Sequence, residues 1–317
     1  MAADALVVLG RPEAVLPWVE RYRKSFDGHP AGGNPIAPEQ WREALGDYRR
    51  VGDWIAFFAR SLEERPWRAV LSDWCDRLAS GISAAAFHGV IRTAHAARSL
   101  SRRETPGRRR ELAEGLGYWA ASYQTLPETS SPTPEPRLPS EAIRRVELLP
   151  NELRRHGFIT DRLLPLGDLP SFARVADMVD TSCDASLFLS DLAETFAGLY
   201  LAHANEATTI ALVHAVTGPG AVRLLLPHLS REVTRKMLRY GWQAAAAIYA
   251  ASASAEPNRA ARQPPLSVEE IIDRAVESGD EHGFKFAEAC LREHAIAPRP
   301  VFLAAALDAT RRLGRGW

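Results

Sequence analysis

FHGVIRTAHA, residues 87–96, carries two histidines, His88 and His95, within a segment that has a helical pattern. Seven residues are close to two turns of an α-helix, so both side chains project from nearly the same face. We predict a helix over about residues 83–101. The two histidines are either ordinary polar residues of a packed helical protein or ligands of a bound group, and the rest of the sequence bears on that choice.

Helical signals dominate the rest of the chain. In PEAVLPWVERYRKSF the apolar residues Val15, Leu16 and Val19 recur at helical spacing, and the sequence from Ser267 to Glu270 is a capping box that predicts a helix start. No segment has a convincing strand pattern or a repeat of 20–50 residues. Further helices are expected at about residues 53–63, 106–123, 169–179, 186–203, 206–216, 220–227, 230–253, 280–295 and 300–313.

These patterns predict an all-α fold, with one large domain of many helices over residues 1–317. The segment LPETSSPTPEPRLPS, residues 126–140, is rich in proline, serine and threonine, and we expect it to be an exposed linker or loop within that domain. The segment TGPGAVRLL, residues 217–225, contains two glycines and Pro219, which predicts a turn between two helices.

Composition narrows the class of protein. Lysine plus arginine and aspartate plus glutamate number 39 each, so no overall charge attracts the chain to nucleic acid or to a membrane surface. The three cysteines are isolated, which fits a reducing compartment and disfavours disulfides or a cysteine zinc site. We expect no apolar run of the roughly 20 residues that a bilayer span needs. We therefore expect a cytoplasmic protein that binds neither nucleic acid nor membrane.

Standard catalytic motifs are absent from the sequence, and histidines provide the remaining candidates. There is no GxGxxG after a strand, no P-loop, no GxSxG and no HExxH. A helical bundle can build a metal site from inward-facing histidines on several helices, and imidazole with an anionic oxygen suits iron. The alternative for each residue is a core histidine satisfied by protein groups. Five histidines lie in largely apolar helical segments: His88, His95, His203, His214 and His282.

The segment DEHGFKFAEA, residues 280–289, adds a lysine to this set. His282 and Lys285 are three residues apart and share a helix face that Phe286 continues. A lysine on an apolar face must reach solvent with its ammonium group, form an ion pair, or lose its proton. A neutral lysine amine can add CO₂ to form an anionic carbamate. The alternative is an ordinary ion pair of Lys285 with Glu281 or Glu288.

Five segments, taken in order, resemble the questin oxidase-like family. They are LPWVERYR (16–23), FHGVIRTAHAARSL (87–100), RRELAEGLGYWAASY (109–123), IALVHAVTG (210–218) and GDEHGFKFAEACLREH (279–294). The family includes fungal enzymes that oxidise anthraquinone-type polyketides, and many bacterial proteins.

The resemblance implies an oxidoreductase that uses O₂ to insert oxygen into, or cleave, an aromatic polyketide ring at a mononuclear non-haem Fe(II) site. It implies His88, His214, His282 and a carboxylated Lys285 as metal ligands. We predict His95, two turns beyond His88, as a neighbouring acid–base residue. Relatives tend to have an Asn–His pair just before the segment matching MAADALVVLG. Because that opening helix also lacks an N-cap residue, we expect a further histidine ligand to be missing from this chain.

Aromatic side chains near the bundle provide a wall for a flat small-molecule aromatic substrate. We predict this role for Trp119, Tyr123 and Trp242, with Gln243 as an orienting hydrogen-bonding group; core packing is the alternative for each aromatic.

Two other functions remain open. One is a metal-free, NADPH-dependent Baeyer–Villiger-type monooxygenase, which needs a partner to supply reductant or an unfamiliar mode of NADPH binding. The other is a non-catalytic helical protein that binds hydrophobic ligands.

Overall fold

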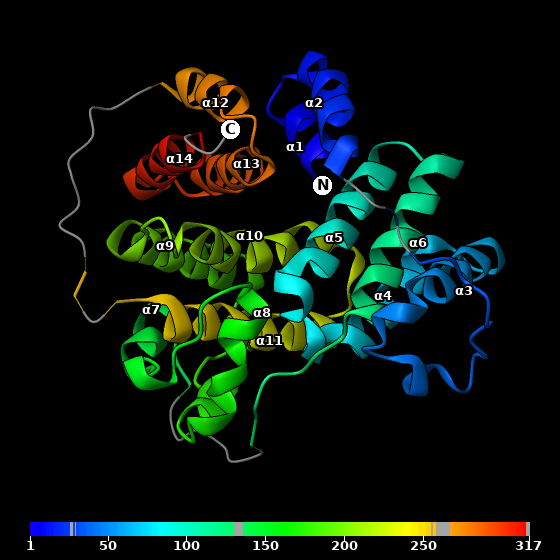
Figure 1. Ribbon diagram of the computed structural model, residues 1–317, viewed down its shortest axis with the longest axis horizontal. Coiled ribbons are helices and arrows are strands. Elements are labelled where there is room, and N and C mark those ends of the chain that lie inside the picture. The colour runs from blue at the N-terminus through cyan, green and yellow to red at the C-terminus, as the bar shows by residue number, and fades with distance from the viewer. Residues whose placement is uncertain (26–27, 29, 130–135, 255, 258–266, 315–317) are drawn as a thin grey trace.

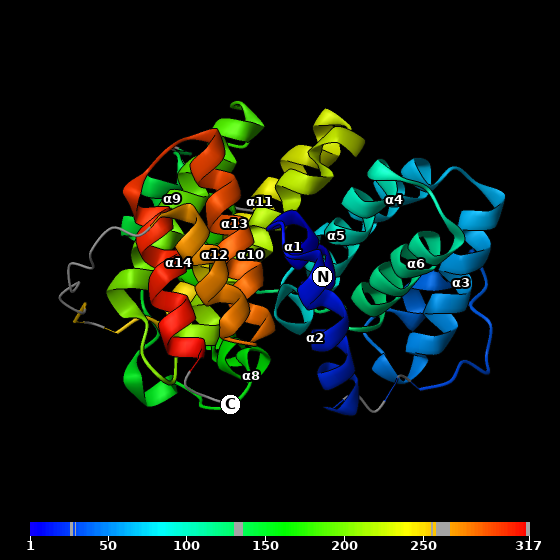
Figure 2. The same cartoon turned by 90° about the horizontal axis from the view of Figure 1, so that it is seen from above.

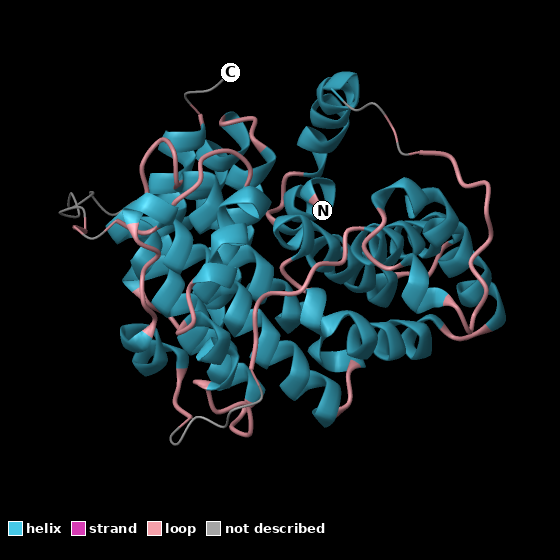
Figure 3. Cartoon of the chain, turned by 60° about the horizontal axis from the view of Figure 1, so that its bottom comes forward, coloured by secondary structure: helices cyan, strands magenta, loops and turns pink. Residues whose placement is uncertain are grey.

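The computed structural model describes residues 1–25, 28, 30–129, 136–254, 256–257 and 267–314. Within these ranges the regular structure is helical, and the only β-type pairing is an isolated bridge between Arg137 and Val179 (Figure 3). The prediction of a single all-α domain is confirmed. The α-helices are α1 (Ala2–Val8), α2 (Val15–Tyr22), α3 (Val51–Glu64), α4 (Trp67–Leu78), α5 (His88–Arg102), α6 (Pro106–Ala121), α7 (Pro139–Ala142), α8 (Ile159–Leu163), α9 (Ala185–His203), α10 (Thr209–Leu225), α11 (Arg231–Ser252), α12 (Val268–Glu277), α13 (Glu281–Ile296) and α14 (Pro300–Leu313).

The helices form two groups around a shared hydrophobic core (Figure 1). Figure 2 shows α3 to α6 on one side and α9 to α14 on the other, with α1 and α2 between them. Helix α10 lies at the junction, because it packs against α5 of the first group and against α9, α11 and α13 of the second. Residues on α5, α10 and α13 are therefore brought together from distant parts of the sequence.

Helix α10 corrects the prediction of a turn at residues 217–225. The helix continues through Pro219, with Gly218 and Gly220 on either side. Proline removes the backbone hydrogen bond to the carbonyl of Ala215 and costs about 3 kcal/mol in an ordinary helix interior. Nearly every residue of α10 is buried, so apolar burial offsets that cost.

The same helix corrects the expectation about apolar runs. Thr209–His228 is long and apolar enough to cross a membrane by length and composition, and it is the one such segment among the described residues. Most of it is buried within the protein, as in an interior helix that is apolar on all sides.

Several boundaries differ from the predicted ones. The segment expected as a helix at about 169–179 is a 3₁₀-helix over Phe172–Asp177. The helix expected at 83–101 begins only at His88, after a 3₁₀ segment at Ala84–Phe87. The predicted capping box at Ser267 and Glu270 is present, with both of its reciprocal hydrogen bonds formed.

The predicted loop at residues 126–140 is only partly described, because residues 130–135 lie outside the described ranges. On either side of them, the Thr129 amide donates to the Ala173 carbonyl at 2.8 Å and the Arg137 amide donates to the Met178 carbonyl at 3.0 Å. Both described ends are thus held against the segment that contains the 3₁₀-helix Phe172–Asp177.

Candidate metal centre

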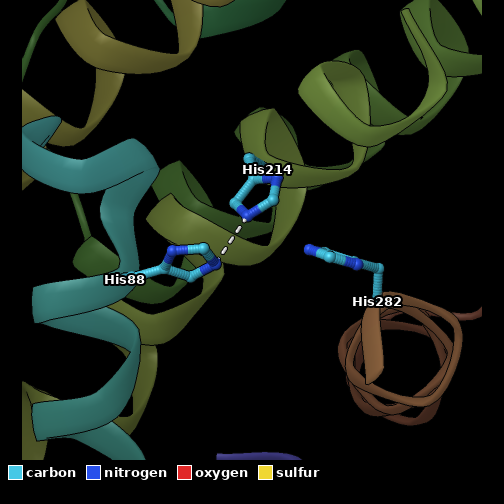
Figure 4. A group of neighbouring side chains, drawn as sticks. All are labelled: His88, His214 and His282. Carbon is cyan, nitrogen blue, oxygen red and sulfur yellow. Dashed lines mark hydrogen bonds between the residues drawn. The ribbon is translucent and has the colours of Figure 1, made fainter. Parts of the chain in front are cut away.

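Three histidines from three helices converge at the junction of the two helix groups. Figure 4 shows His88 of α5, His214 of α10 and His282 of α13 directed toward one another. The Nε2 atoms of His88 and His214 are 3.1 Å apart, and one ligand nitrogen from each of the three residues lies within 4.8 Å of the others. Two nitrogens bound at right angles to an ion about 2.1 Å away are about 3 Å apart, so the His88–His214 spacing fits two adjacent metal ligands.

A strained turn places His88. Ala85, Ala86 and Phe87 have φ of 46°, 54° and 66°, the left-handed region that costs non-glycine residues about 1–3 kcal/mol each. The Phe87 ring lies directly against Gly218 of α10, where an added Cβ would be only 2.3 Å from the ring. Gly218 is one helical turn beyond His214, so this close approach sets the start of α5 opposite the histidine of α10.

His214 is oriented by the backbone of its own helix. Its Nδ1–H donates to the Ile210 carbonyl at 2.7 Å, and because a carbonyl only accepts, the proton of the neutral ring is on Nδ1. The Nε2 lone pair is then directed at the cluster. Backbone bonding of the remote imidazole nitrogen is the usual arrangement for a metal-binding histidine.

His282 is oriented by the N-cap of α13. The Asp280 carboxylate accepts from the His282 backbone N–H at 2.7 Å and from its Nδ1 at 2.9 Å. Although burial raises the pKa of Asp280, its hydrogen bond and charge interaction with His282 leave that pKa below its ordinary value. The capping aspartate is therefore ionised at neutral pH and leaves Nε2 of His282 as the free nitrogen.

The cluster favours neutral imidazoles. Burial lowers the pKa of His88 to about 3, with Lys285 and His282 adding to the effect, and burial also holds the pKa of His214 well below its ordinary value. Metal ions bind the neutral form of histidine, so these two side chains need not lose a proton near pH 7.

Lys285 lies one turn beyond His282 and is also buried. Its side chain lines the same cavity as His88 and His282, and burial lowers its pKa while Glu281 and Asp280 act in the opposite direction. The ion pair considered as the alternative is not formed: among the described residues no carboxylate oxygen lies within 4.0 Å of the Lys285 ammonium. Glu288 pairs instead with Arg98 and Arg292.

A cavity of about 530 Å³ opens beside the cluster. Besides His88, His282 and Lys285, its lining includes Met1 and the pair Arg92 and Glu111, in which the Arg92 Nε donates to the carboxylate at 2.8 Å. Three aromatic residues also line it: Trp18, Tyr22 and Tyr118. This volume is within the range of small-molecule binding sites.

His95, predicted as an acid–base residue, lies outside this cavity. It is buried two turns from His88, and its Nδ1 is 2.9 Å from Asp4 of α1. Asp4 also accepts from Arg98, which in turn binds Glu288. His95 therefore belongs to an ionic network that joins α1, α5 and α13.

The residues predicted to contact a flat substrate, Trp119, Tyr123, Trp242 and Gln243, likewise do not line the cavity. Trp119 and Trp242 are fully buried, and their indole N–H groups donate to the carbonyls of Gly81 and Val175. Gln243 donates to the Pro127 carbonyl, and the Tyr123 hydroxyl is 2.7 Å from the Ser80 hydroxyl. Their positions correspond to core packing, because these N–H and hydroxyl groups already have protein partners.

The cavity aromatics Trp18, Tyr22 and Tyr118 were missed from the sequence. Two lie in the amphipathic segment LPWVERYR, and the third directly precedes Trp119. The remaining candidate, His203, is distant from the cluster and has its Nδ1 3.4 Å from the Ser254 hydroxyl.

Fold and site together define a class: an all-helical protein in which three histidines from three helices, one buried and two partly buried, meet beside a cavity of ligand size. The chain belongs to the questin oxidase-like family, whose sequence model matches residues 19–290. That family indicates an oxidoreductase acting on aromatic polyketides. No curated protein matches the chain.

Proposed function

We propose that the protein uses O₂ to oxidise, or to cleave a ring of, an anthraquinone-like polyketide at a mononuclear non-haem iron. His88, His214, His282 and a carboxylated Lys285 are the proposed ligands. The observation that supports this most is the convergence of three imidazoles, of which His214 and His282 have the remote nitrogen bonded to a carbonyl and a carboxylate. A bound Fe(II) supplies Lewis acidity and one-electron chemistry toward O₂.

The protein groups hold and orient the reacting partners. The Ile210 carbonyl and the Asp280 carboxylate each fix one proton on a histidine and prevent the ring from turning. The buried walls around His214 exclude bulk water from one side of the cluster, and the 530 Å³ cavity admits substrate on the side of His88 and His282.

Lys285 provides the anionic oxygen in this proposal. Its neutral Nζ attacks CO₂, a C–N bond forms, and one proton leaves to water, which yields a carbamate. Burial favours the neutral amine that this reaction requires.

Electron balance separates two forms of the reaction. Insertion of both oxygen atoms of O₂ into substrate needs no external electrons. Insertion of one atom, with the other released as water, needs two, and we propose that a reductant-supplying partner or NADPH provides them.

Metal analysis tests the proposal. Protein reconstituted anaerobically with Fe(II) and bicarbonate, then desalted, should hold one iron per chain. His214→Ala and His282→Ala should lose it, whereas His156→Ala, a change at an exposed loop histidine, should not. Absence of stoichiometric iron in the unsubstituted protein would contradict the metal assignment.

The same preparations address the two other functions. NADPH consumption by the iron-free protein with substrate favours the metal-free monooxygenase. A melting temperature that neither Fe(II) nor a chelator changes, together with ligand binding, favours the non-catalytic binding protein.

A further inference from the structure

Helix α2 differs from the other long helices because none of its residues is buried. Its main contacts are with α1 and with the 3₁₀ turns on either side of it in sequence. A link to the site is made by Trp18, whose ring meets Phe284 of α13 edge to face at 5.6 Å. Phe284 lies between His282 and Lys285 in sequence, so α2 is joined to the helix that carries two members of the site.

Two large aromatic side chains of α2 face the cavity. The rings of Trp18 and Tyr22 are stacked, with centroids 4.7 Å apart and an interplanar angle of 23°. Both line the cavity that contains His88, and Tyr22 is 43 % exposed. The pair is less buried than Trp119 and Trp242, which have no exposed surface.

A third ring comes from α6, in the group formed by helices α3 to α6. Tyr118 of α6 lines the same cavity, is half-buried and meets Tyr48 edge to face at 5.9 Å. The cavity lining therefore combines imidazole and amine groups with three partly exposed aromatic rings. Ring faces open to a cavity recognise other flat π systems through stacking.

We propose that Trp18, Tyr22 and Tyr118 form the substrate-binding wall of this protein and select flat polycyclic aromatic ligands over saturated ones of similar size. We call these three residues the aromatic wall. This inference rests on the proposed function for the reaction that follows binding, but recognition itself requires no metal.

Helix α2 is held on the protein by side-chain contacts with neighbouring helices. None of its residues is fully buried, but Val15 and Trp18 pack partly against the small core that contains Phe284. The α1–α2 connection is held by Arg11, which pairs with Glu269 and Asp273 of α12. These contacts position the two rings of α2 at the cavity.

Binding to the metal-free protein tests the wall separately from the metal. We would titrate 1,8-dihydroxyanthraquinone, followed by its own absorbance, and cholate as a saturated polycyclic comparison. Trp18→Ala should weaken binding of the anthraquinone about tenfold or more, and Tyr22→Leu by a smaller factor. Leu16→Ala, on the same helix but 72 % exposed and outside the cavity lining, should leave it unchanged.

The conservative variants distinguish stacking from simple apolar contact. Trp18→Phe should retain most of the preference for the anthraquinone over cholate, and Trp18→Leu should lose it. Circular dichroism confirms folding of each variant. Unchanged anthraquinone affinity in folded Trp18→Ala and Tyr22→Leu, or equal affinity for the two probes in the unsubstituted protein, overturns the proposal.

The two proposals fail in different ways. If the protein holds no iron but the Trp18 variants lose anthraquinone binding, the metal assignment falls and the aromatic wall stands. If iron is bound and anthraquinone affinity is the same in all variants, the aromatic wall is wrong and the metal assignment stands.

Discussion

The two ends of helix α5 carry similar histidines in different surroundings. At its start, His88 follows three left-handed residues and meets His214 through a single 3.1 Å nitrogen–nitrogen contact. Two turns later, His95 meets a carboxylate, Asp4, within an ionic network. At the first end, the imidazole nitrogens have few protein partners. At the second end, His95 lies among paired acidic and basic side chains. Two histidines on one helix face thus have different surroundings.

Alanine substitutions at His88 and His95 should show the largest difference between the two ends of α5. His88→Ala removes a proposed ligand, so iron affinity should fall more than about 100-fold and activity should fall with it. His95→Ala should retain iron and lose stability instead. Iron content after desalting and urea unfolding of both variants provide the measurements. Loss of iron in His95→Ala, with the fold intact, would contradict the distinction.

Removing a charge from the network should produce the next largest effect. Glu288 is 2 % exposed and binds both Arg98 and Arg292, so Glu288→Gln leaves buried positive charge without its partner. We expect a loss of about 3 kcal/mol in the free energy of unfolding, measured in urea.

A surface pair provides the control for that measurement. Glu104 pairs with Arg109, and both side chains are more than 40 % exposed. Glu104→Gln should cost less than about 1 kcal/mol. Equal losses in the two variants would show that the network at the His95 end adds nothing beyond an ordinary surface pair.

Acid should weaken both ends of α5 in the metal-free protein. Burial lowers the pKa of His88 to about 3 and that of His95 to about 4, against an ordinary value near 6.5. Between these values the unfolded chain binds more protons than the folded one, so stability falls as pH decreases from about 7 toward 4. At pH 5 each histidine should account for about 2 kcal/mol of that loss.

Substituting each histidine in turn identifies how much it contributes to the loss of stability in acid. His95→Gln, which cannot be protonated, should reduce the slope of unfolding free energy against pH between 7 and 5, and His88→Gln should do the same. His156→Gln at an exposed loop position is the control and should leave the slope unchanged. A slope that no buried-site variant alters would show that other groups cause the acid sensitivity.

The sequence predicted what depends on local pattern. Helical spacing placed His88, His214 and His282 on separate helices, and the capping box at Ser267 appears as predicted. The family resemblance selected these histidines from the larger set, and the structure brings them together.

Features that depend on packing were not predictable in this way. Pro219 remains within a helix because the burial of α10 outweighs the free-energy cost of a proline in a helix interior. The residues near Pro219 in sequence do not indicate that burial. Asp4, the partner of His95, is 91 residues away, and only the packing of α1 brings it close. Trp119 and Trp242 were predicted to contact substrate because an aromatic residue in an apolar helix can belong either to a binding surface or to the core. The carbonyls that accept from their indole N–H groups belong to residues distant in sequence, so the structure is needed to identify them.

The smallest expected effect on iron binding tests whether the strained turn positions His88. Gly218→Ala places a methyl group 2.3 Å from the Phe87 ring, well inside van der Waals contact, so the ring or the helix must move. We expect a loss of about 1–3 kcal/mol in stability and a decrease of about tenfold in iron affinity as His88 shifts relative to His214. Gly198→Ala is the matched control, since that helical glycine of α9 has open space around its Cα and should gain up to about 1 kcal/mol. Adding Phe87→Ala to Gly218→Ala should relieve the contact without restoring iron affinity, because the ring that fixes the start of α5 is then missing. Full iron affinity in the double variant would show that the backbone alone, and not the Phe87–Gly218 contact, holds His88 in place.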